Sequence, residues 1–309
     1  MDLFTIALIV VGLSLFEIVS SIDNAIINAE VLSTMSQRAR RWFLIWGMLL
    51  AVFLIRGLLP WLIIWITSPA LGPIGALTAT FSNDPKVHET IESSAPFLLI
   101  GGGIFLVFLF FHWLFLEKKN FCIPGERWCH ARGVWFFAVV SIILATIVWF
   151  ALQEHPMMAF AAVIGSTAFF ITHGFKENAE KAERELKQQH LSDASKLFYL
   201  EIIDATFSID GVLGAFAFTL SVPLILFGNG VGAIVVRELT IRGIDRIRKY
   251  AYLKNGAMYS VFVLGSIMLL DSFHITIPKW LPPIATIAIV SYFFYRSKHL
   301  IDRQGASAA

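Results

Sequence analysis

The chain has 309 residues, of which 57% are hydrophobic and only 15% are charged, with 28 Phe, 9 Trp and a mean hydropathy of +0.73. This composition excludes an ordinary water-soluble domain, because no soluble core of this length needs so much apolar surface. The net charge of +2 does not indicate a nucleic-acid partner, since the basic residues fall in short connections between apolar segments. The composition therefore predicts a protein embedded in a lipid bilayer.

Nine apolar segments follow one another along the chain, each close to the ~20 residues that a helix needs to cross ~30 Å of hydrocarbon. They lie near 3–32, 42–66, 96–116, 134–152, 156–174, 197–220, 222–241, 256–273 and 282–297. We therefore expect an all-α polytopic membrane protein, with nine transmembrane helices in a single transmembrane domain over 1–309. The first residues lack a basic region, so we expect no cleaved signal peptide.

Lys and Arg concentrate in alternate connections between these segments. Basic clusters follow the first, third, fifth, seventh and ninth segments, in the stretches 38–41, 118–132, 176–196, 242–254 and 296–303. The other connections carry little basic charge beyond Lys86 and Lys279. Because short basic loops stay in the cytoplasm, we expect the N-terminus outside and the C-terminus in the cytoplasm. Four tryptophans are expected as interface anchors: Trp42, Trp113, Trp128 and Trp280.

A short acidic motif occurs twice. Ser21-Ile22-Asp23 returns as Ser208-Ile209-Asp210, and an acid precedes each Asp by six residues, Glu17 in the first copy and Asp204 in the second. Carboxylates at membrane depth cost several kcal/mol unless they are paired or ligated. Four of them in two matching places predict a cation pathway.

Three ordered matches indicate a repeat of three helices. The Ser-Ile-Asp motifs relate the first helix to the sixth, Arg56 and Arg237 relate the second to the seventh, and Gly103 and Gly265 relate the third to the eighth. Each pair is five helices apart, so the copies cross the membrane in opposite senses, as in many secondary transporters. We expect a first repeat over 1–117, connecting helices over 134–174, a charged cytoplasmic loop over 175–196, a second repeat over 197–274 and a last helix over 282–297.

The spacing within each motif predicts an interrupted helix. Residues six apart on a straight α-helix differ by about 240° in direction and about 9 Å in height, so the two acids of a motif cannot share a face. We therefore expect a kink or π-bulge between the acids of each copy. The candidate ligands are all oxygens, which suit Mg²⁺, Ca²⁺ or Mn²⁺ better than copper or zinc. They come from Glu17, Asp23, Asn24, Asn28, Asp204 and Asp210, with the hydroxyls of Ser21 and Ser208.

A purely structural role for these acids is the alternative. Arg56 and Arg237 lie in apolar runs and would form neutral ion pairs with two of the carboxylates. Two arginines cannot neutralise four carboxylates, and Glu30 and Glu201 add further acids toward the cytoplasmic side. The default for charges inside a membrane therefore favours a functional cation site, with the arginines as counter-charges when the site is empty.

The cysteines and histidines give weaker signals. Cys122 and Cys129 fall in a cytoplasmic connection at a spacing that is not typical of zinc sites, so we interpret them as reduced structural thiols. His112 and His274 lie near predicted helix ends, where a side chain that reaches the interface or forms a hydrogen bond is more typical than a metal ligand. His173 shares a helix face with Glu177 and Glu180, which is more typical of a solvated face than of a metal site.

The strings FEIVSSIDNA at 16–25 and DATFSIDGV at 204–212 resemble the paired acidic motifs of the TerC family, and more closely its DUF475 branch. The similarity extends from the first span through the eighth. Carried over position by position, it marks Glu17, Asp23 and Asn24 in the first half, and Asp204 and Asp210 in the second. Gly211 stands where the first copy has Asn24, so the second copy lacks that amide.

This resemblance implies a bacterial inner-membrane protein of the LysE-type transporter superfamily, related to proteins linked to tellurium resistance and to manganese export. Together with the oxygen ligand set, it leads to the hypothesis of a non-enzymatic divalent cation transporter, with Mn²⁺ as the expected cargo and Ca²⁺ or another divalent cation as the alternative. The expected partners are the lipid bilayer and the metal ion. A desolvated carboxylate has a raised pKa and can exchange a proton for metal, so proton antiport or the membrane potential would drive efflux.

Two other functions stay open at this point. An intramembrane aspartyl protease would use Asp23 and Asp210 as a water-activating pair that shares a proton. That hypothesis lacks a Gly-x-Gly-Asp pattern and leaves Glu17 and Asp204 unexplained. A membrane scaffold that helps to load metal into exported enzymes would use the same carboxylates as a transporter.

Overall fold

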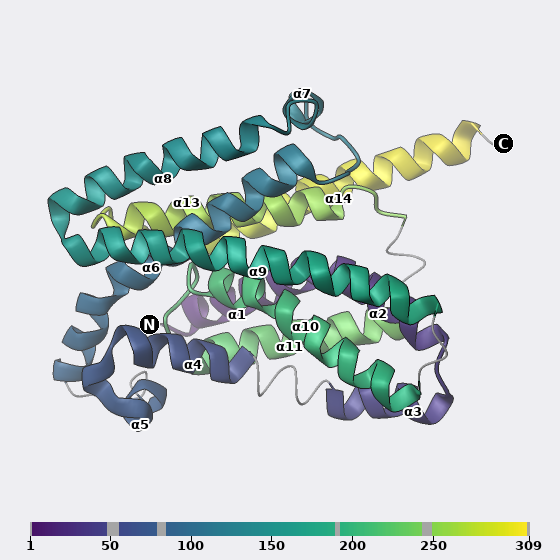
Figure 1. The fold of residues 1–309 in the computed structure, drawn as a ribbon, viewed down its shortest axis with the longest axis horizontal. Coiled ribbons are helices and arrows are strands. Elements are labelled where there is room, and N and C mark those ends of the chain that lie inside the picture. Colours follow the sequence, from purple (N-terminus) through teal and green to yellow (C-terminus); the bar gives the residue numbers. More distant parts are fainter. Residues whose placement is uncertain (1, 48–55, 79–84, 189–191, 243–248, 308–309) are drawn as a thin grey trace.

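The computed structural model describes residues 2–47, 56–78, 85–188, 192–242 and 249–307. These residues form helices joined by turns and loops, and none of the described ranges contains a strand (Figure 1). The expectation of an all-α protein is therefore confirmed.

The first half of the chain departs from simple uninterrupted spans. The first apolar segment forms two helices, α1 (Leu3–Ser20) and α2 (Ile22–Ser33). The second segment begins as α3 (Gln37–Trp42) and a π-helical turn (Phe43–Gly47), and α4 (Arg56–Thr67) covers its end. A 3₁₀ turn (Pro69–Leu71) and α5 (Gly72–Thr78) follow, and α6 (Pro85–Leu116) begins earlier than the predicted start at 96.

The remaining helices are longer and mostly continuous. They are α7 (Glu126–His130), α8 (Trp135–Glu154), α9 (Pro156–Gln188), α10 (Asp193–Ala215), α11 (Val222–Arg242), α13 (Leu253–Ser272) and α14 (Leu281–Ser307). Helix α9 continues through most of the stretch 175–196 that we expected as a charged loop. The physical reason is the Ala, Glu and Lys content of this stretch, since these residues are strong helix formers.

Six helices in the described part of the chain are long and apolar enough to cross a membrane. They are Leu3–Ser20, Glu92–Leu116, Trp135–Glu154, Pro156–Phe175, Val222–Thr240 and Leu253–Ser272. A seventh span would be the pair Gly57–Thr67 and Pro69–Leu77, which is bent by 104° at Ser68. Helix α10 carries several acids and α14 ends in charged residues, so neither belongs to this set. The protein is thus a multi-pass membrane protein, and the number nine is not confirmed.

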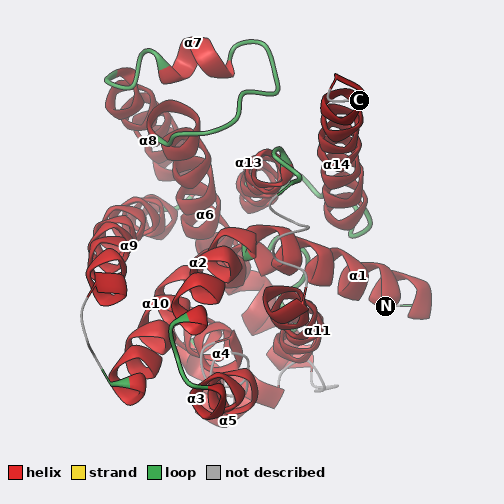
Figure 2. Ribbon diagram, turned by 90° about the vertical axis from the view of Figure 1, so that its right-hand side faces the viewer, coloured by secondary structure: helices red, strands yellow, loops and turns green. Residues whose placement is uncertain are grey.

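Helix α6 lies at the centre of one half of the molecule, where it packs against α8, α9 and α13 (Figures 1 and 2). The run Gly101-Gly102-Gly103 allows close approach on two sides. A Cβ on Gly101 would lie 3.0 Å from the carbonyl oxygen of Ala161 on α9, and a Cβ on Gly103 would lie 3.0 Å from the carbonyl oxygen of Gly265 on α13. The contact of Gly265 is reciprocal, since its own Cβ would lie 3.1 Å from the carbonyl oxygen of Gly103. Small residues at such crossings let membrane helices gain dispersion contacts along their backbones.

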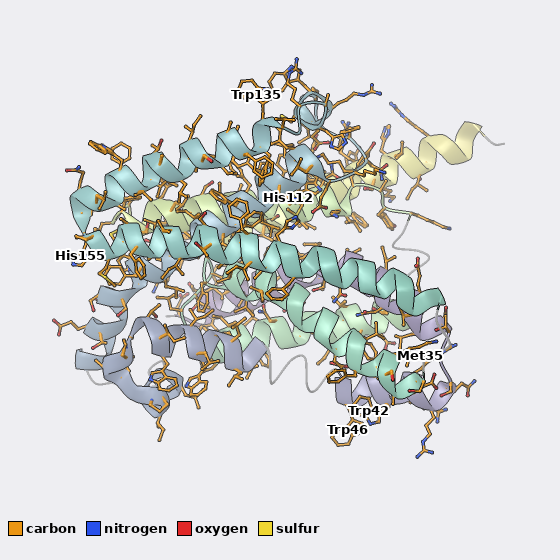
Figure 3. All side chains as sticks on the ribbon, viewed as in Figure 1. Met35, Trp42, Trp46, His112, Trp135 and His155 are labelled. Carbon is orange, nitrogen blue, oxygen red and sulfur yellow. The ribbon has the colours of Figure 1, made fainter. Side chains whose placement is uncertain are left out.

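Two of the connections between helices lie at opposite ends of the bundle. Met35, in the connection after α2, lies toward the same end as the C-terminus, whereas His155, between α8 and α9, lies at the opposite end (Figures 1 and 3).

The tryptophan expectation is wrong at one position. Trp113 is 0% exposed and packs against Phe110 and Tyr259, so it belongs to the interior and not to an interface belt. Trp42, Trp128 and Trp280 are exposed, as interface anchors must be. Trp113 lies near the end of α6, which has one face toward the bundle and one face toward its surroundings. The packing of Trp113 against Tyr259 of α13 places it on the inner face.

The glycine crossing between α6 and α13 generates a first prediction. Gly103→Ala places a methyl group against the backbone of Gly265, which cannot move aside as a side chain would, so we expect a loss of about 1–3 kcal/mol from overpacking. The measurement is the thermal unfolding temperature of the detergent-purified protein. Gly174→Ala on α9 is the matched control, since nothing in the described chain lies within 4 Å of its Cβ position. An equal unfolding temperature in Gly103→Ala and wild type would contradict the crossing.

Candidate functional site

The first acidic motif lies at a break between two helices. Helix α1 ends at Ser20, Ser21 forms a turn with φ −92° and ψ 0°, and α2 begins at Ile22. The hydroxyl of Ser21 donates to Oε1 of Glu17 at 2.5 Å, and the Ser21 amide donates to the Glu17 carbonyl at 3.1 Å. The expected interruption between Glu17 and Asp23 is therefore confirmed, and Ser21 stabilises both the turn and the upstream carboxylate.

The second acidic motif behaves differently. Helix α10 runs from Asp193 to Ala215 as one α-helix across Asp204 and Asp210. The expectation of a kink or π-bulge in this copy is wrong. A physical reason is that Asp210 is followed by Gly211, where the first copy has Asn24, so the second copy has one fewer side chain that competes for backbone hydrogen bonds.

The two motifs meet where α1 crosses α10. Glu17 is only 1% exposed, and its Oε2 atom lies 3.1 Å from the Cβ position of Gly211, the residue after Asp210. One turn further on, the Cβ position of Gly214 lies 2.5 Å from the ring of Phe16. The absence of side chains at these two positions lets α10 approach the buried carboxylate. The structure thus brings an acid of the first copy next to the second motif.

Helix α11 packs against another side of Glu17. The Cβ position of Gly232 lies 2.6 Å from Cβ of Glu17, and that of Gly228 lies 2.7 Å from Cβ of Leu13. The hydroxyl of Ser14 donates to the Gly228 carbonyl at 2.9 Å. Glycines on both α10 and α11 therefore allow a carboxylate to sit between three closely packed helices.

Three amides are buried on α2 and α11, two helices that pack against α1. Asn24 and Asn28, both candidate ligands, are buried on α2, and Asn28 Oδ1 has no hydrogen-bond partner in the described part of the chain. Sequence reasoning missed the third, Asn229 on α11, which is 0% exposed. Neither Oδ1 nor Nδ2 of Asn229 has a hydrogen-bond partner among the described residues. A buried amide left in this state costs ~1–3 kcal/mol for each unmade bond. The signal available in the sequence was an amide between two glycines, Gly228 and Gly230, inside an apolar run.

Arg237 lies near a different acid from those of the repeated motifs. Its Nη2 atom donates to the carbonyl of Phe43 at 2.7 Å and lies 4.0 Å from Oε1 of Glu201, while its guanidinium stacks 4.2 Å above the Phe43 ring. Gly47 leaves room for the pair, since a Cβ there would overlap Oε1 of Glu201. The structural alternative, in which an arginine neutralises an acid, thus applies to Glu201. The π-helical turn at Phe43–Gly47 widens the helix at the point where Arg237 binds its backbone.

Some candidates have side chains that lie outside the described residues, namely Asp23, Arg56, Asp204 and Ser208. Asp210 is partly exposed on α10. Among the residues that are described, no group of three or more His, Cys, Asp or Glu side chains is placed to hold a metal ion. The full carboxylate set therefore stays a prediction, and the geometry above concerns Glu17 and its surroundings.

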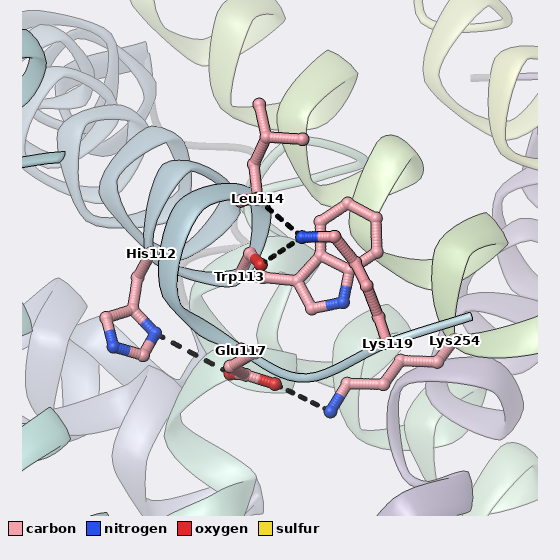
Figure 4. Close-up of polar contacts among 6 residues, drawn as sticks. All are labelled: His112, Trp113, Leu114, Glu117, Lys119 and Lys254. Carbon is pink, nitrogen blue, oxygen red and sulfur yellow. Dashed lines mark hydrogen bonds and ion pairs between the residues drawn. The ribbon is translucent and has the colours of Figure 1, made fainter. Parts of the chain in front are cut away.

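Two histidines that the sequence did not relate lie side by side. The ring of His112 on α6 is 8% exposed, and its centroid is 3.8 Å from that of His173 on α9. Nδ1 of His112 lies 3.6 Å from Oε1 of Glu117, and Oε2 of Glu117 accepts from Nζ of Lys254 at 2.7 Å (Figure 4). His112 therefore belongs to a buried polar cluster between α6, α9 and α13 and does not reach an interface. His274 is exposed, with a φ of 62° at the end of α13.

The connection after α6 forms hydrogen bonds with neighbouring helices. Nζ of Lys119 donates to the carbonyls of Trp113 and Leu114 at 2.5 and 2.6 Å, which places its charge at the negative end of α6 (Figure 4). Burial lowers the pKa of Lys119 to about 8. Glu126, also buried, accepts from the backbone amide of Cys122 at 2.8 Å and from the side chain of Asn255 at 3.2 Å. Cys122 and Cys129 are free thiols, as expected.

The Arg237 contact generates a second prediction. Arg237→Met removes the cation from a carboxylate that is about nine-tenths buried, which costs ~3–5 kcal/mol when one partner of a buried pair is lost. We expect low abundance of this variant in the membrane, measured by quantitative immunoblotting of membrane fractions. The double variant Arg237→Met/Glu201→Leu should recover much of the abundance, because no charge is then left buried. Equal abundance of the single and double variants would show that Glu201 is not the group that Arg237 neutralises.

Comparison with known proteins identifies one family. No curated protein and no solved structure matches the chain. A family model described as "Protein of unknown function (DUF475)" matches residues 22–302. The matched range contains the second Ser-Ile-Asp motif and, except for Ser21, the first. It also contains α10 and α11, the helices that pack against Glu17. Because the match covers most of the chain, this protein belongs to the DUF475 family.

Proposed function

We propose that this protein is a divalent cation transporter of the inner membrane, with Mn²⁺ efflux as its expected activity. The observation that supports this function best is the burial of Glu17 against Gly211, which brings the first acidic motif next to Asp210 of the second. A carboxylate in this position is costly in a helical membrane protein unless it has a functional partner. The hydroxyl of Ser21 contacts it, and two buried amides, Asn24 and Asn28, follow on α2; oxygens of these kinds suit a hard cation.

The same proposal includes nine membrane-crossing segments with an inverted repeat. Gly103 and Gly265, matched by sequence, contact each other reciprocally, as expected for two positions beside a pseudo-two-fold axis. The offset that relates Asp23 to Asp210 also relates Ser14 to Glu201, and the offset between Arg56 and Arg237 also relates Gly47 to Gly228. Ser14 contacts Gly228, and its counterpart Glu201 contacts Gly47. Three matched contacts across different helices support a repeat and, with it, a relation to the TerC and LysE-type transporters.

The chemistry follows from the residues around the break in the first motif. Glu17 and Asp210 are the described acids of the site, and Asp23 and Asp204 would complete it. A carboxylate surrounded by apolar helices binds either a proton or a cation, because burial disfavours its isolated charge. Exchange of protons for the metal at these acids would couple efflux to the proton gradient.

The two other functions make different use of the same residues. An aspartyl protease needs Asp23 and Asp210 close together with a water molecule, and it assigns no role to the buried Glu17. The placement of Glu17 beside the second motif therefore favours a cation site over a protease. A metal-loading scaffold would use the same ligands, so it differs from a transporter only in whether the metal crosses the membrane.

The third prediction tests the cation site. Glu17→Gln and Asp210→Asn keep the side-chain volume and remove the charge, so both variants should reach the membrane and lose at least about tenfold in Mn²⁺ efflux, given that even indirect changes around metal ligands cost ~10–100-fold. The measurement is cellular manganese content under manganese excess, in a host that lacks its own exporter. Cys122→Ser is the control and should retain efflux.

Normal efflux in a well-expressed Glu17→Gln/Asp210→Asn double variant would refute the transporter. If cellular manganese is unchanged even by the wild-type protein while exported enzymes gain metal, the scaffold becomes the better description.

The fourth prediction concerns orientation. Positive-inside bias supports a cytoplasmic C-terminus, so the connection that contains Arg127 should face the cytoplasm and the one that contains Lys279 should face outside. Both side chains are exposed. In a Cys122→Ser/Cys129→Ser background, a membrane-impermeant thiol reagent should label Lys279→Cys in intact cells and Arg127→Cys only after permeabilisation. The reverse pattern would invert the assigned topology.

A further inference from the structure

We infer that Asn229 is an additional oxygen ligand of the cation site, contributed by α11. This inference rests on the proposed function, because it assigns a residue to the same site. It goes beyond the repeated motifs, since Asn229 lies in neither of them. Its basis is a side chain that is wholly buried and lacks the contacts that buried amides normally have.

The state of Asn229 is unusual for a buried polar residue. Its side chain is 0% exposed, and neither amide atom forms a hydrogen bond within the described chain. Large majorities of buried polar side chains do have such partners, and each exception asks for an explanation such as a bound ion or water. A leucine has the same branched side-chain skeleton without polar atoms that need partners, so packing alone does not account for an asparagine here.

The position of Asn229 on α11 relates it to the carboxylate. Gly228, the residue before it, contacts Leu13, and Gly232, three residues after it, contacts Glu17. On an α-helix, Asn229 lies about 60° from Gly232 in direction and about 4.5 Å along the axis. Helix α11 packs against α1, α2, α4 and α10, which include the helices of both acidic motifs. Asn229 therefore lies within one helical turn of the level of Glu17, inside the group of helices that surrounds it.

The chemistry of an amide suits this place. An amide carbonyl is a neutral, hard oxygen donor that Mn²⁺, Ca²⁺ and Mg²⁺ all accept. It adds a ligand without adding a negative charge that would need a counter-ion when the site is empty. The second motif has Gly211 where the first has Asn24, so an amide from α11 would supply the donor that the second copy lacks.

Asn255 shows what a structural asparagine looks like in the same protein. It is 1% exposed on α13, and its amide nitrogen donates to the carbonyl of Asn120 at 3.0 Å and to the carboxylate of Glu126 at 3.2 Å. The two residues match in type, burial and location in a membrane helix. They differ in hydrogen bonding, which makes Asn255 the natural control.

The experiment measures thermal unfolding of the detergent-purified full chain over a series of MnCl₂ concentrations. A ligand that binds only the folded state raises the unfolding temperature, by an amount that grows with the logarithm of the ratio of its concentration to its Kd. For Asn229→Leu we expect an unfolding temperature without metal that equals or exceeds that of wild type, and a tenfold or greater rise in the Mn²⁺ concentration that is needed for the same shift as in wild type. Asn229→Asp, which keeps the oxygen donor, should retain the wild-type Mn²⁺ response.

Asn255→Leu should give the opposite pattern, with a lower unfolding temperature without metal and an unchanged dependence of the shift on Mn²⁺ concentration. If Asn229→Leu behaves like Asn255→Leu, Asn229 is structural and the inference is overturned while the cation site stands. If wild type shows no shift with Mn²⁺ or Ca²⁺, the proposed function fails, and the ligand role of Asn229 fails with it.

Discussion

The burial of a carboxylate among closely packed membrane helices is the constraint on which the rest of this structure depends. Glu17 is 1% exposed on α1, in a chain whose helices are long and apolar enough to cross a bilayer. An acid in this environment needs polar neighbours, and it receives a hydroxyl from Ser21 at the break between α1 and α2. The break lies between Glu17 and Asp23, which a straight helix would carry to different faces.

Glycines supply the space that this carboxylate requires. Gly211 on α10 and Gly232 on α11 both face Glu17, and neither position has room for a side chain without movement of its neighbours. The same principle holds away from the acids, where Gly103 and Gly265 let α6 and α13 approach backbone to backbone. In a bilayer, where lipid tails are as apolar as leucine, close packing of this kind replaces the hydrophobic effect as the force that holds helices together.

Charged side chains of this fold form separate clusters. Arg237 lies beside Glu201 and the π-helical turn, and Lys254 binds Glu117 beside the His112 and His173 rings. Each cluster joins helices that are distant in sequence. Arg237 thus lies beside Glu201, an acid outside the repeated motifs.

The sequence by itself determined the class of protein, the position of most helices and the break at Ser21. These features depend on local rules, because the length of an apolar run and the competition of Ser and Asn for backbone hydrogen bonds act within a few residues. The uninterrupted course of α10 already shows the limit of such rules, since a similar motif there did not break the helix.

Only the tertiary structure decided which side chains meet. The contact of Glu17 with Gly211, the approach of Arg237 to Glu201 and the pairing of His112 with His173 all join residues on different helices. The burial of two other residues also depends on helix packing. The sequence alone placed Trp113 at an interface, and it did not single out Asn229. The physical reason is that helix periodicity fixes the face on which a residue lies, whereas the partner of that face depends on how closely and at which point two helices cross.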